Sequence, residues 1–124
     1  MEVISCAKHI RQSPRKVRVV ADVVRHLGVE EALDKLALSV RKAAVPVRKV
    51  LHSAVANAEN NFGLKRESLK IKEIQVSPAP TVRRVRFRAR GRADVIRKRN
   101  CHIRVVLEGE KEIKGKGKKP AERK

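Results

Sequence analysis

Hydrophobic positions recur at helical spacing through the first half of the chain. Ser13 followed by Pro14 predicts the start of a first helix, because serine caps helix N-termini and proline is tolerated in the first turn. The pattern predicts that this helix ends at Leu27 and Gly28, with Gly28 free to adopt a left-handed cap. Its buried stripe is expected to consist of Val17, Val20, Ala21 and Val24.

Two further helices are predicted. The second covers residues 29–38, with its acids on the outer face and with Val29, Leu33, Leu36 and Ala37 facing inward. The third covers residues 40–61, but Pro46 lies too far inside for a first turn, so we expect a bend or a later start. Gly63 followed by Leu64 predicts a Schellman-type end. The expected inner face of the third helix is Ala43, Val47, Val50, Leu51, Ala54, Val55 and Ala58.

From Leu69 onward the hydrophobic period changes to two, which indicates half-buried strands. Residues 69–76 alternate, and a change of phase near Lys72 and Glu73 predicts a β-bulge. A second alternating run covers residues 103–107, and residues 2–7 predict a further short strand. The expected fold class is α+β, with three helices packed on a small three-stranded antiparallel sheet.

The two later strands can pair as the base of a hairpin. Residues 77–80 contain two prolines and cannot lie inside a central paired strand. The arms and tip, about residues 77–101, are therefore expected to leave the body, and a dozen residues per arm would project roughly 40 Å. Because an isolated two-stranded ribbon is marginal in water, we expect a partner to order it. We predict one domain over residues 1–108 and a disordered, Lys-rich basic tail over residues 109–124.

Charge changes this picture, because the arm is almost purely cationic. The chain has 32 Lys and Arg against 13 Asp and Glu, a formal net charge of +19. Between Arg83 and Arg104, ten Lys or Arg residues are opposed by a single acid, Asp94. Such a segment repels itself unless a polyanion replaces its counterions, which favours nucleic acid as the partner. An aromatic content of 2% argues against a platform that stacks bases on many rings.

Two basic patches supply the candidate contacts. Arginines alternate with small or apolar residues over residues 84–92, so an extended strand would place their guanidinium groups on one face. A second patch lies at or before the first helix's start, where cations oppose the helix dipole and are better explained by a bound phosphate. The alternative, a solvated charge run, is disfavoured by the single sign of the charge. The candidates are Lys8, Arg11, Arg15, Lys16, Arg18, Arg83, Arg84, Arg86, Arg88, Arg90, Arg92, Arg97, Lys98 and Arg99.

Histidines and cysteines show no catalytic or metal-binding pattern. Cys101 and His102 are adjacent on a strand, so their side chains point to opposite faces and cannot chelate together. Cys6 could lie near Cys101 if the first and last strands pair, but two thiols alone are weak evidence for a metal. We expect no enzyme activity, no catalytic residue, no metal and no cofactor. No signal peptide, membrane segment or homo-oligomer is expected, which favours a cytoplasmic location.

Three stretches, in order, resemble one known family over about residues 7–108. The most specific stretch contains Arg83, Arg88, Ala89, Gly91 and Arg92, then, after nine residues, His102, Ile103, Val105 and Leu107. The other two are residues 13–22 and residues 42–61. They resemble the bacterial form of large-subunit ribosomal protein twenty-two. Asn100 and Cys101 replace the family's common Thr-Ser, and Phe87 places a bulky ring near the tip.

The resemblance implies a structural constituent of the large ribosomal subunit, in the cytoplasm. It implies that the chain binds several segments of large-subunit rRNA and ties them together during assembly, beside neighbouring large-subunit proteins. It further implies that the hairpin lines the peptide exit tunnel and meets the nascent polypeptide. The resemblance adds His102 to the rRNA-binding candidates. It makes Arg88, Arg90, Gly91 and Arg92 the candidates for the tunnel wall.

Two alternatives remain open. A free-standing nucleic-acid-binding regulator should dimerise and carry a helix-turn-helix with a basic second helix, but the second predicted helix is acidic. A nuclease would need acids that gather around Mg²⁺ recruited by its substrate. The acids available for this on the first two helices are Asp22, Glu30, Glu31 and Asp34.

Overall fold

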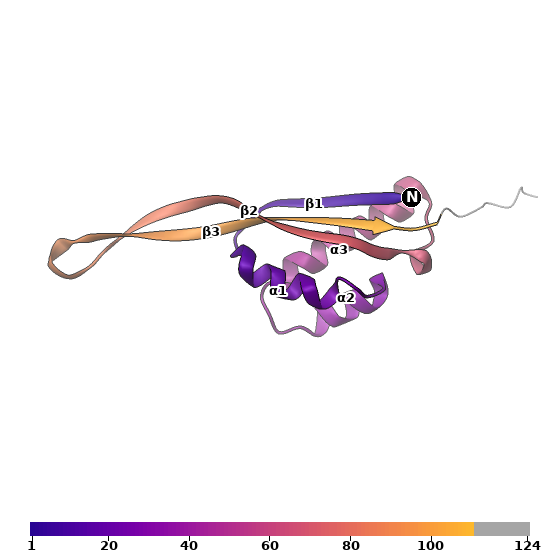
Figure 1. Ribbon diagram of the computed structural model, residues 1–124, viewed down its shortest axis with the longest axis horizontal. Coiled ribbons are helices and arrows are strands. Elements are labelled where there is room, and N and C mark those ends of the chain that lie inside the picture. The colour runs from indigo at the N-terminus through magenta and orange to yellow at the C-terminus, as the bar shows by residue number, and fades with distance from the viewer. Residues whose placement is uncertain (111–124) are drawn as a thin grey trace, which may run out of the picture.

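The computed structural model describes residues 1–110, which form three helices and a three-stranded antiparallel sheet. The predicted α+β fold is confirmed. The elements are β1 (Glu2–Ile10), α1 (Pro14–Val24), α2 (Val29–Leu38), α3 (Ala44–Phe62), β2 (Lys70–Phe87) and β3 (Ala93–Glu108), with 3₁₀ turns at Arg66–Ser68 and Ala89–Gly91. The sheet order is β1-β3-β2, and β2 and β3 run far beyond the body as a twisted ribbon (Figure 1). Most of the predicted tail lies outside the described residues.

Helix α1 begins as predicted and ends earlier. Ser13 has extended N-cap geometry and Pro14 opens the first turn, but the Ser13 side chain makes no capping hydrogen bond. The predicted end at Gly28 is wrong, because the helix stops at Val24 and Gly28 is extended, with φ −62° and ψ 155°, rather than left-handed. Gly28 instead begins α2, since its carbonyl accepts the first helical bond, from the Ala32 N–H at 2.9 Å. The short connection brings α2 back onto the body.

Helix α2 has the predicted bounds, with one difference on its inner face. Val29, Ala32 and Leu36 are buried, so Ala32 takes the place predicted for Ala37, which is exposed. Leu33 packs against the core and is half-buried. The three buried positions follow the i, i+3, i+7 spacing of a narrow helical stripe.

Helix α3 resolves the problem posed by Pro46. The helix starts at Ala44, so the proline falls in the first turn, where its missing N–H removes no helical bond. At the other end Gly63 adopts a left-handed φ of +60°. The Leu64 N–H donates to the Ala58 carbonyl at 3.1 Å and the Gly63 N–H to the Glu59 carbonyl at 3.2 Å, which confirms the Schellman-type end.

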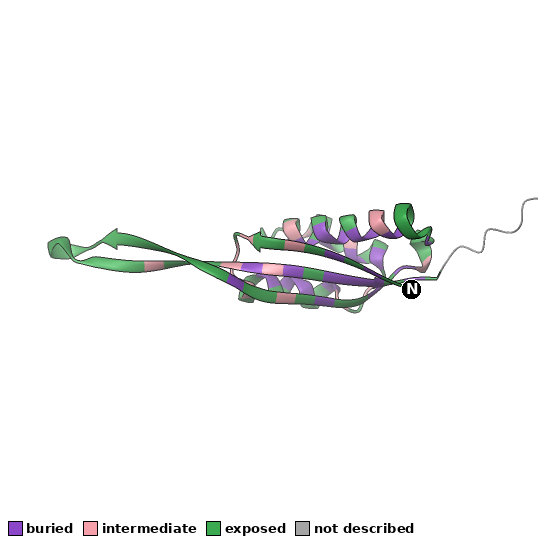
Figure 2. Cartoon of the chain, turned by 90° about the horizontal axis from the view of Figure 1, so that it is seen from above, coloured by how far each residue is buried: buried purple, intermediate pink, exposed green. Residues whose placement is uncertain are grey.

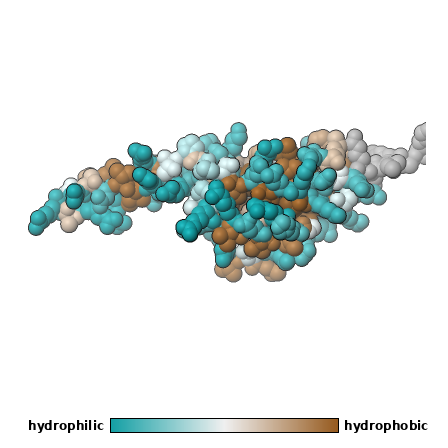
Figure 3. All heavy atoms as spheres, in the orientation of Figure 1, coloured by the Kyte–Doolittle hydropathy of each residue, from teal (hydrophilic) through white to brown (hydrophobic). Residues whose placement is uncertain are grey.

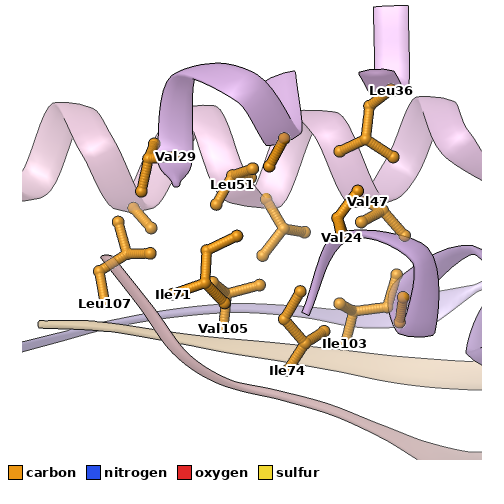
Figure 4. Close-up of a cluster of buried hydrophobic side chains, with 14 of the residues drawn as sticks. Val24, Val29, Leu36, Val47, Leu51, Ile71, Ile74, Ile103, Val105 and Leu107 are labelled. Carbon is orange, nitrogen blue, oxygen red and sulfur yellow. The ribbon is translucent and has the colours of Figure 1, made fainter. Parts of the chain in front are cut away.

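The core lies between the helices and one face of the sheet (Figure 4). β1 and β3 alternate as predicted, with Val3 opposite Leu107 and Ala7 opposite Ile103. β1 continues past its predicted end at Ala7 to Ile10, through an irregularity in register. Side chains that fill the core include Val24, Val29, Leu36, Val47, Leu51, Ile71, Ile74, Ile103, Val105 and Leu107.

Strand β2 keeps its pairing at Pro78 because it is an edge strand, whereas Pro80 falls in an irregularity of the ladder. The predicted bulge is present between Ile71 and Glu73. Pro78 pairs with Cys101 on one side, and its missing N–H costs no ladder bond on the other. A second irregularity follows between Ala79 and Val82, and beyond it β2 and β3 pair with each other alone. There almost every residue is exposed (Figure 2).

Candidate nucleic-acid interface

An open groove of about 1560 Å³ lies where the hairpin leaves the body. Its walls are the end of β1 and the following loop, the first turn of α1, the segment before α3 and the base of the hairpin. No Asp or Glu of residues 1–110 lines it. The cations that line it, here called the basic groove, are Arg11, Arg15, Lys16, Arg41, Lys42, Arg84, Arg97, Lys98 and Arg99. A low-dielectric concavity lined by one sign of charge attracts the opposite charge strongly.

The irregular end of β1 sets the first wall of the basic groove. His9 has a left-handed φ of +56°, which is uncommon for a residue with a side chain. Its backbone N–H donates to Nδ1 of His102 at 3.0 Å, and the two rings meet edge to face with centroids 4.8 Å apart. Because Nδ1 accepts this bond, the ring proton of neutral His102 lies on Nε2. The contact holds the chain where it turns toward Arg11 and α1.

The N-terminus of α1 opens onto the basic groove. Ser13, Arg15 and Lys16 all line the groove, and the Ser13 hydroxyl does not occupy the first-turn N–H groups. No acid lies in the first turn of this helix. Pro14 has no N–H, and the Lys16 N–H already donates to the Ser13 carbonyl at 3.1 Å, which leaves the Arg15 N–H open in the first turn. This N–H, the positive end of a helix dipole and two cations therefore converge at one place, a combination that favours phosphate.

Arg41 and Lys42 belong to the groove and were missed by the sequence reasoning. They lie between α2 and α3, in a segment that the hydrophobic pattern assigned to the start of the third helix. The later start at Ala44 leaves both outside the helix, facing α1 and the hairpin base across the groove. Two neighbouring cations just before the proline-containing first turn were the available signal.

The arginines of the hairpin do not form one continuous face. Arg84 and Arg86 share a face, opposite Ile96 and Asp94 respectively. The prediction that Arg88 and later arginines continue this face is wrong, because β2 ends at Phe87. The alternation stops where the chain must reverse direction.

The tip is a compact turn over residues 88–92. The Arg88 N–H donates to the Arg92 carbonyl at 2.7 Å, and Arg90 and Gly91 both have positive φ, of 58° and 70°. Arg88 forms an ion pair with Asp94 at 3.1 Å, so the one acid of the arm is already neutralised. The four tunnel-wall candidates thus lie together at the far end of the hairpin, as predicted from the position of the tip.

Three candidates of the body lie outside the basic groove. Arg18 donates through Nε and Nη2 to the Val76 carbonyl, both at 3.2 Å, so its guanidinium ties α1 to the free edge of β2. Arg25 lies two turns further along the same side, directly after α1, and donates to the Ile74 carbonyl at 3.3 Å. Lys8 and His102 do not line the groove, and the His102 ring is held by His9. Their contact with nucleic acid stays a prediction.

Apart from Asp94 on the arm, the acids within residues 1–110 lie on the body, and several of them form ion pairs. Asp22 binds Arg25 at 2.9 Å, and Glu31 binds Lys35 at 3.2 Å. The hydrogen bond from the Lys72 ammonium lowers the pKa of the Glu2 carboxyl, although both are exposed. These carboxylates are scattered rather than gathered around one point. Within residues 1–110 no group of three or more His, Cys, Asp or Glu side chains could hold a metal ion.

The cysteines lie apart despite the pairing of β1 with β3. Cys6 is exposed opposite Arg104, whereas Cys101 is buried opposite Ile10, and both are free thiols. Burial raises the pKa of the Cys101 thiol, which makes it a poor nucleophile. Among the described residues, no helix is long and apolar enough to cross a membrane.

Comparison with known proteins decides which family this architecture belongs to. The sequence model described as "Ribosomal protein L22p/L17e" matches residues 5–108, from β1 to the end of β3. The chain belongs to this family. The resemblance drawn from the motifs is confirmed, and the match includes the basic groove and the whole hairpin.

Curated relatives agree with this assignment. The chain is 51% identical over 107 residues to "Large ribosomal subunit protein uL22" of Thermotoga sp. (strain RQ2), covering 86% of this chain and 67% of the relative. It is 50% identical over 106 residues to the protein of the same name from Desulfitobacterium hafniense (strain DSM 10664 / DCB-2), covering 86% and 93%. The protein of strain Y51 matches equally, at 50% over 106 residues.

Proposed function

We propose that this protein binds rRNA through the basic groove and the hairpin together, and so ties distant rRNA segments into one structure. As a member of the family, the chain is a structural constituent of the large ribosomal subunit and not an enzyme. Its partners are rRNA and neighbouring proteins of that subunit. The observation that carries the proposal is the acid-free groove, which continues directly into the cationic hairpin.

The groove and the arm suit different parts of one RNA target. The groove offers the α1 N-terminus and cations from four chain segments, which suits a phosphate backbone that bends into it. The arm presents guanidinium groups over a long, narrow ribbon, which suits insertion between RNA segments. Several phosphates are thus neutralised by side chains fixed on one scaffold. This is structural work without turnover.

The tip carries the finer part of the proposal. Arg88, Arg90, Gly91 and Arg92 form the wall of the peptide exit tunnel and meet the nascent polypeptide there. Support comes from the family resemblance of these residues and from their position at the far end of the hairpin. A free-standing regulator is disfavoured, because α2 presents acids in its first turn, Glu30 and Glu31, where a recognition helix needs cations.

Fractionation of a cell lysate on a sucrose gradient, at moderate and high salt, tests the location. We expect the protein to migrate with the large subunit and to stay there through the high-salt wash, because its arm is enclosed by RNA. Finding it free, or on chromosomal DNA, would contradict the proposal and favour the regulator.

The salt dependence of binding to purified large-subunit rRNA tests the mode. Neutralising about ten phosphates predicts a log–log slope of roughly −7 to −9. A slope shallower than about −3 would show that the groove and the arm are not the main contacts.

A further inference from the structure

The outer hairpin has two unlike faces. Directly opposed residues of an antiparallel pair project to the same face, and successive pairs alternate. Val85 lies opposite Val95 and Phe87 opposite Ala93, so these four residues share one face, here called the apolar strip. Arg84 and Arg86 belong to the other face. Figure 3 shows hydrophobic residues gathered on the arm, well beyond the body.

The apolar strip is uncovered. Val85 is 61% exposed, Val95 60% and Phe87 78%, and no helix within residues 1–110 packs on this part of the ribbon. Single exposed apolar residues are common on protein surfaces, but these are contiguous across two strands. Their side chains contribute to no core, so a partner that offers apolar surface is needed to remove them from water.

The charges around the strip identify the chemistry of that partner. On the same face, one step toward the body, Arg83 lies directly opposite Arg97. Like charges in this position repel, and an anion between them turns the repulsion into attraction. At the other end of the strip lies the arginine-rich tip, and the only acid of the arm, Asp94, is on the opposite face in an ion pair with Arg88.

A partner that is both polyanionic and apolar in flat patches is RNA with exposed bases. A hydrophobic protein surface would satisfy the strip but leave the flanking guanidinium groups unpaired. We propose that the apolar strip receives unstacked rRNA bases, with the Phe87 ring stacked on one base and Arg83 and Arg97 holding a phosphate of the same strand. This inference rests on the proposed function and names the part of the rRNA that the arm contacts.

The scarcity of aromatic residues is consistent with this role. A chain with two Phe and no Trp or Tyr cannot build a multi-ring platform. One exposed ring on a ribbon can still stack on one base, and such contacts do not depend on sequence, because every base has a π-face. The arm therefore combines base contact with a flanking phosphate contact on one face, and presents Arg84 and Arg86 on the other.

Variants of the two phenylalanines test the inference with the full-length chain and in vitro transcribed large-subunit rRNA. Phe87→Ala is expected to weaken binding about tenfold, because the stacked base is lost, with an unchanged salt slope, because no charge is removed. Phe87→Leu, which keeps apolar area without the planar ring, should fall between. Phe62→Ala removes the other ring, at the end of α3 and away from the arm, and should bind like the wild type.

The outcomes separate the inference from the function on which it rests. Wild-type affinity in Phe87→Ala, with steep salt dependence retained, would overturn the stacking and leave rRNA binding intact. Failure of the wild-type chain to bind the rRNA would overturn the proposed function itself. Because Phe87 is far from the core, circular dichroism of the variant should match the wild type and exclude misfolding as the cause.

Photocrosslinking in the assembled subunit distinguishes the competing partners. A benzophenone amino acid placed at position 87 should crosslink to rRNA. Crosslinks only to the nascent polypeptide, or only to a neighbouring protein, would contradict base contact and assign the strip to a protein surface.

Discussion

Within the body, β2 and β3 pair with helices packed on one of their faces, whereas beyond Val82 the same two strands continue with no element of residues 1–110 covering them. Ile74, Ile103 and Val105 are buried in the first region. Val85 and Val95 occupy similar ladder positions in the second and are mostly exposed. Backbone pairing is therefore common to both regions, and burial is what separates them.

The difference teaches how one chain can combine a stable fold with a long extension. The body obtains its stability from apolar area removed from water. The hairpin buries little apolar area and carries like charges that repel one another. Its strand pairing is therefore marginal until rRNA supplies counter-charge and contact. Stability and binding are thereby assigned to separate regions, joined through two continuous strands.

Replacing the outer hairpin should have the largest effect, because it removes the binding region and leaves the folded body. In a variant with residues 83–97 replaced by an Asn-Gly turn, seven Lys or Arg residues are removed. We expect the salt slope of rRNA binding to become shallower by about 5–6, with affinity reduced by several orders of magnitude at low salt. The helical circular dichroism signal and the unfolding transition of the body should persist. Loss of folding would show that the arm stabilises the body.

Truncation of core and arm residues compares the two regions directly. Leu51→Ala, at a fully buried site, should lower the free energy of unfolding by about 2–5 kcal/mol. Val85→Ala, on the exposed ribbon, should change it by less than about 0.5 kcal/mol. Urea denaturation followed by circular dichroism measures both. Similar losses in the two variants would contradict the division of roles.

Two arginines of α1 test whether cations on one helix can be divided into those that bind rRNA and those that stabilise the fold. Arg15 lines the basic groove, so Arg15→Leu should weaken rRNA binding and reduce the magnitude of the salt slope by about 1 with little effect on stability. Arg18 bonds to the edge of β2, so Arg18→Leu should cost about 0.5–1.5 kcal/mol of stability and leave the salt slope nearly unchanged. Filter binding measures the salt slope of each variant, and urea denaturation measures its free energy of unfolding. The reverse pattern would place the two residues in each other's roles.

The His9–His102 contact offers a smaller test at the hairpin base. Asn at position 102 places an amide oxygen near the position of Nδ1 and can still accept from the His9 N–H, whereas Gln cannot. His102→Gln should therefore cost about 0.5–1.5 kcal/mol, and His102→Asn less. The exchange rate of the His9 amide, measured by NMR, reports the bond itself. Equal exchange in both variants would mean that the bond does not hold this turn.

The sequence predicted the fold where local rules decide the structure. The start of α1 at Ser13 and Pro14 and the left-handed end of α3 at Gly63 follow from the chemistry of those residues alone. Gly28 has equal conformational freedom, but the return of Val29 to the core decides its geometry, so the predicted helix end was wrong. Tertiary packing overrode the local signal there.

The sequence predicted the chemical class of the partner, but it did not predict which cations the fold brings together. The hairpin cations indicated a polyanion, because a single acid, Asp94, opposes ten of them between Arg83 and Arg104. The basic groove was not predicted, since Arg41 and Arg84 come to line one groove only in the folded chain, where α1, the segment before α3 and the hairpin base lie together. The role of Arg18 could not be foreseen either, because its acceptor on β2 is 58 residues away.

Hydrogen exchange of the free and rRNA-bound protein tests the central claim most directly. In the free protein, backbone amides of β3 in the body, over residues 101–107, should be strongly protected, whereas those over residues 93–98 should exchange nearly as fast as an unfolded chain. On binding large-subunit rRNA, protection of the arm should rise toward that of the body. Equal protection of the two regions in the free protein would contradict the account, because the hairpin would then be stable without its partner.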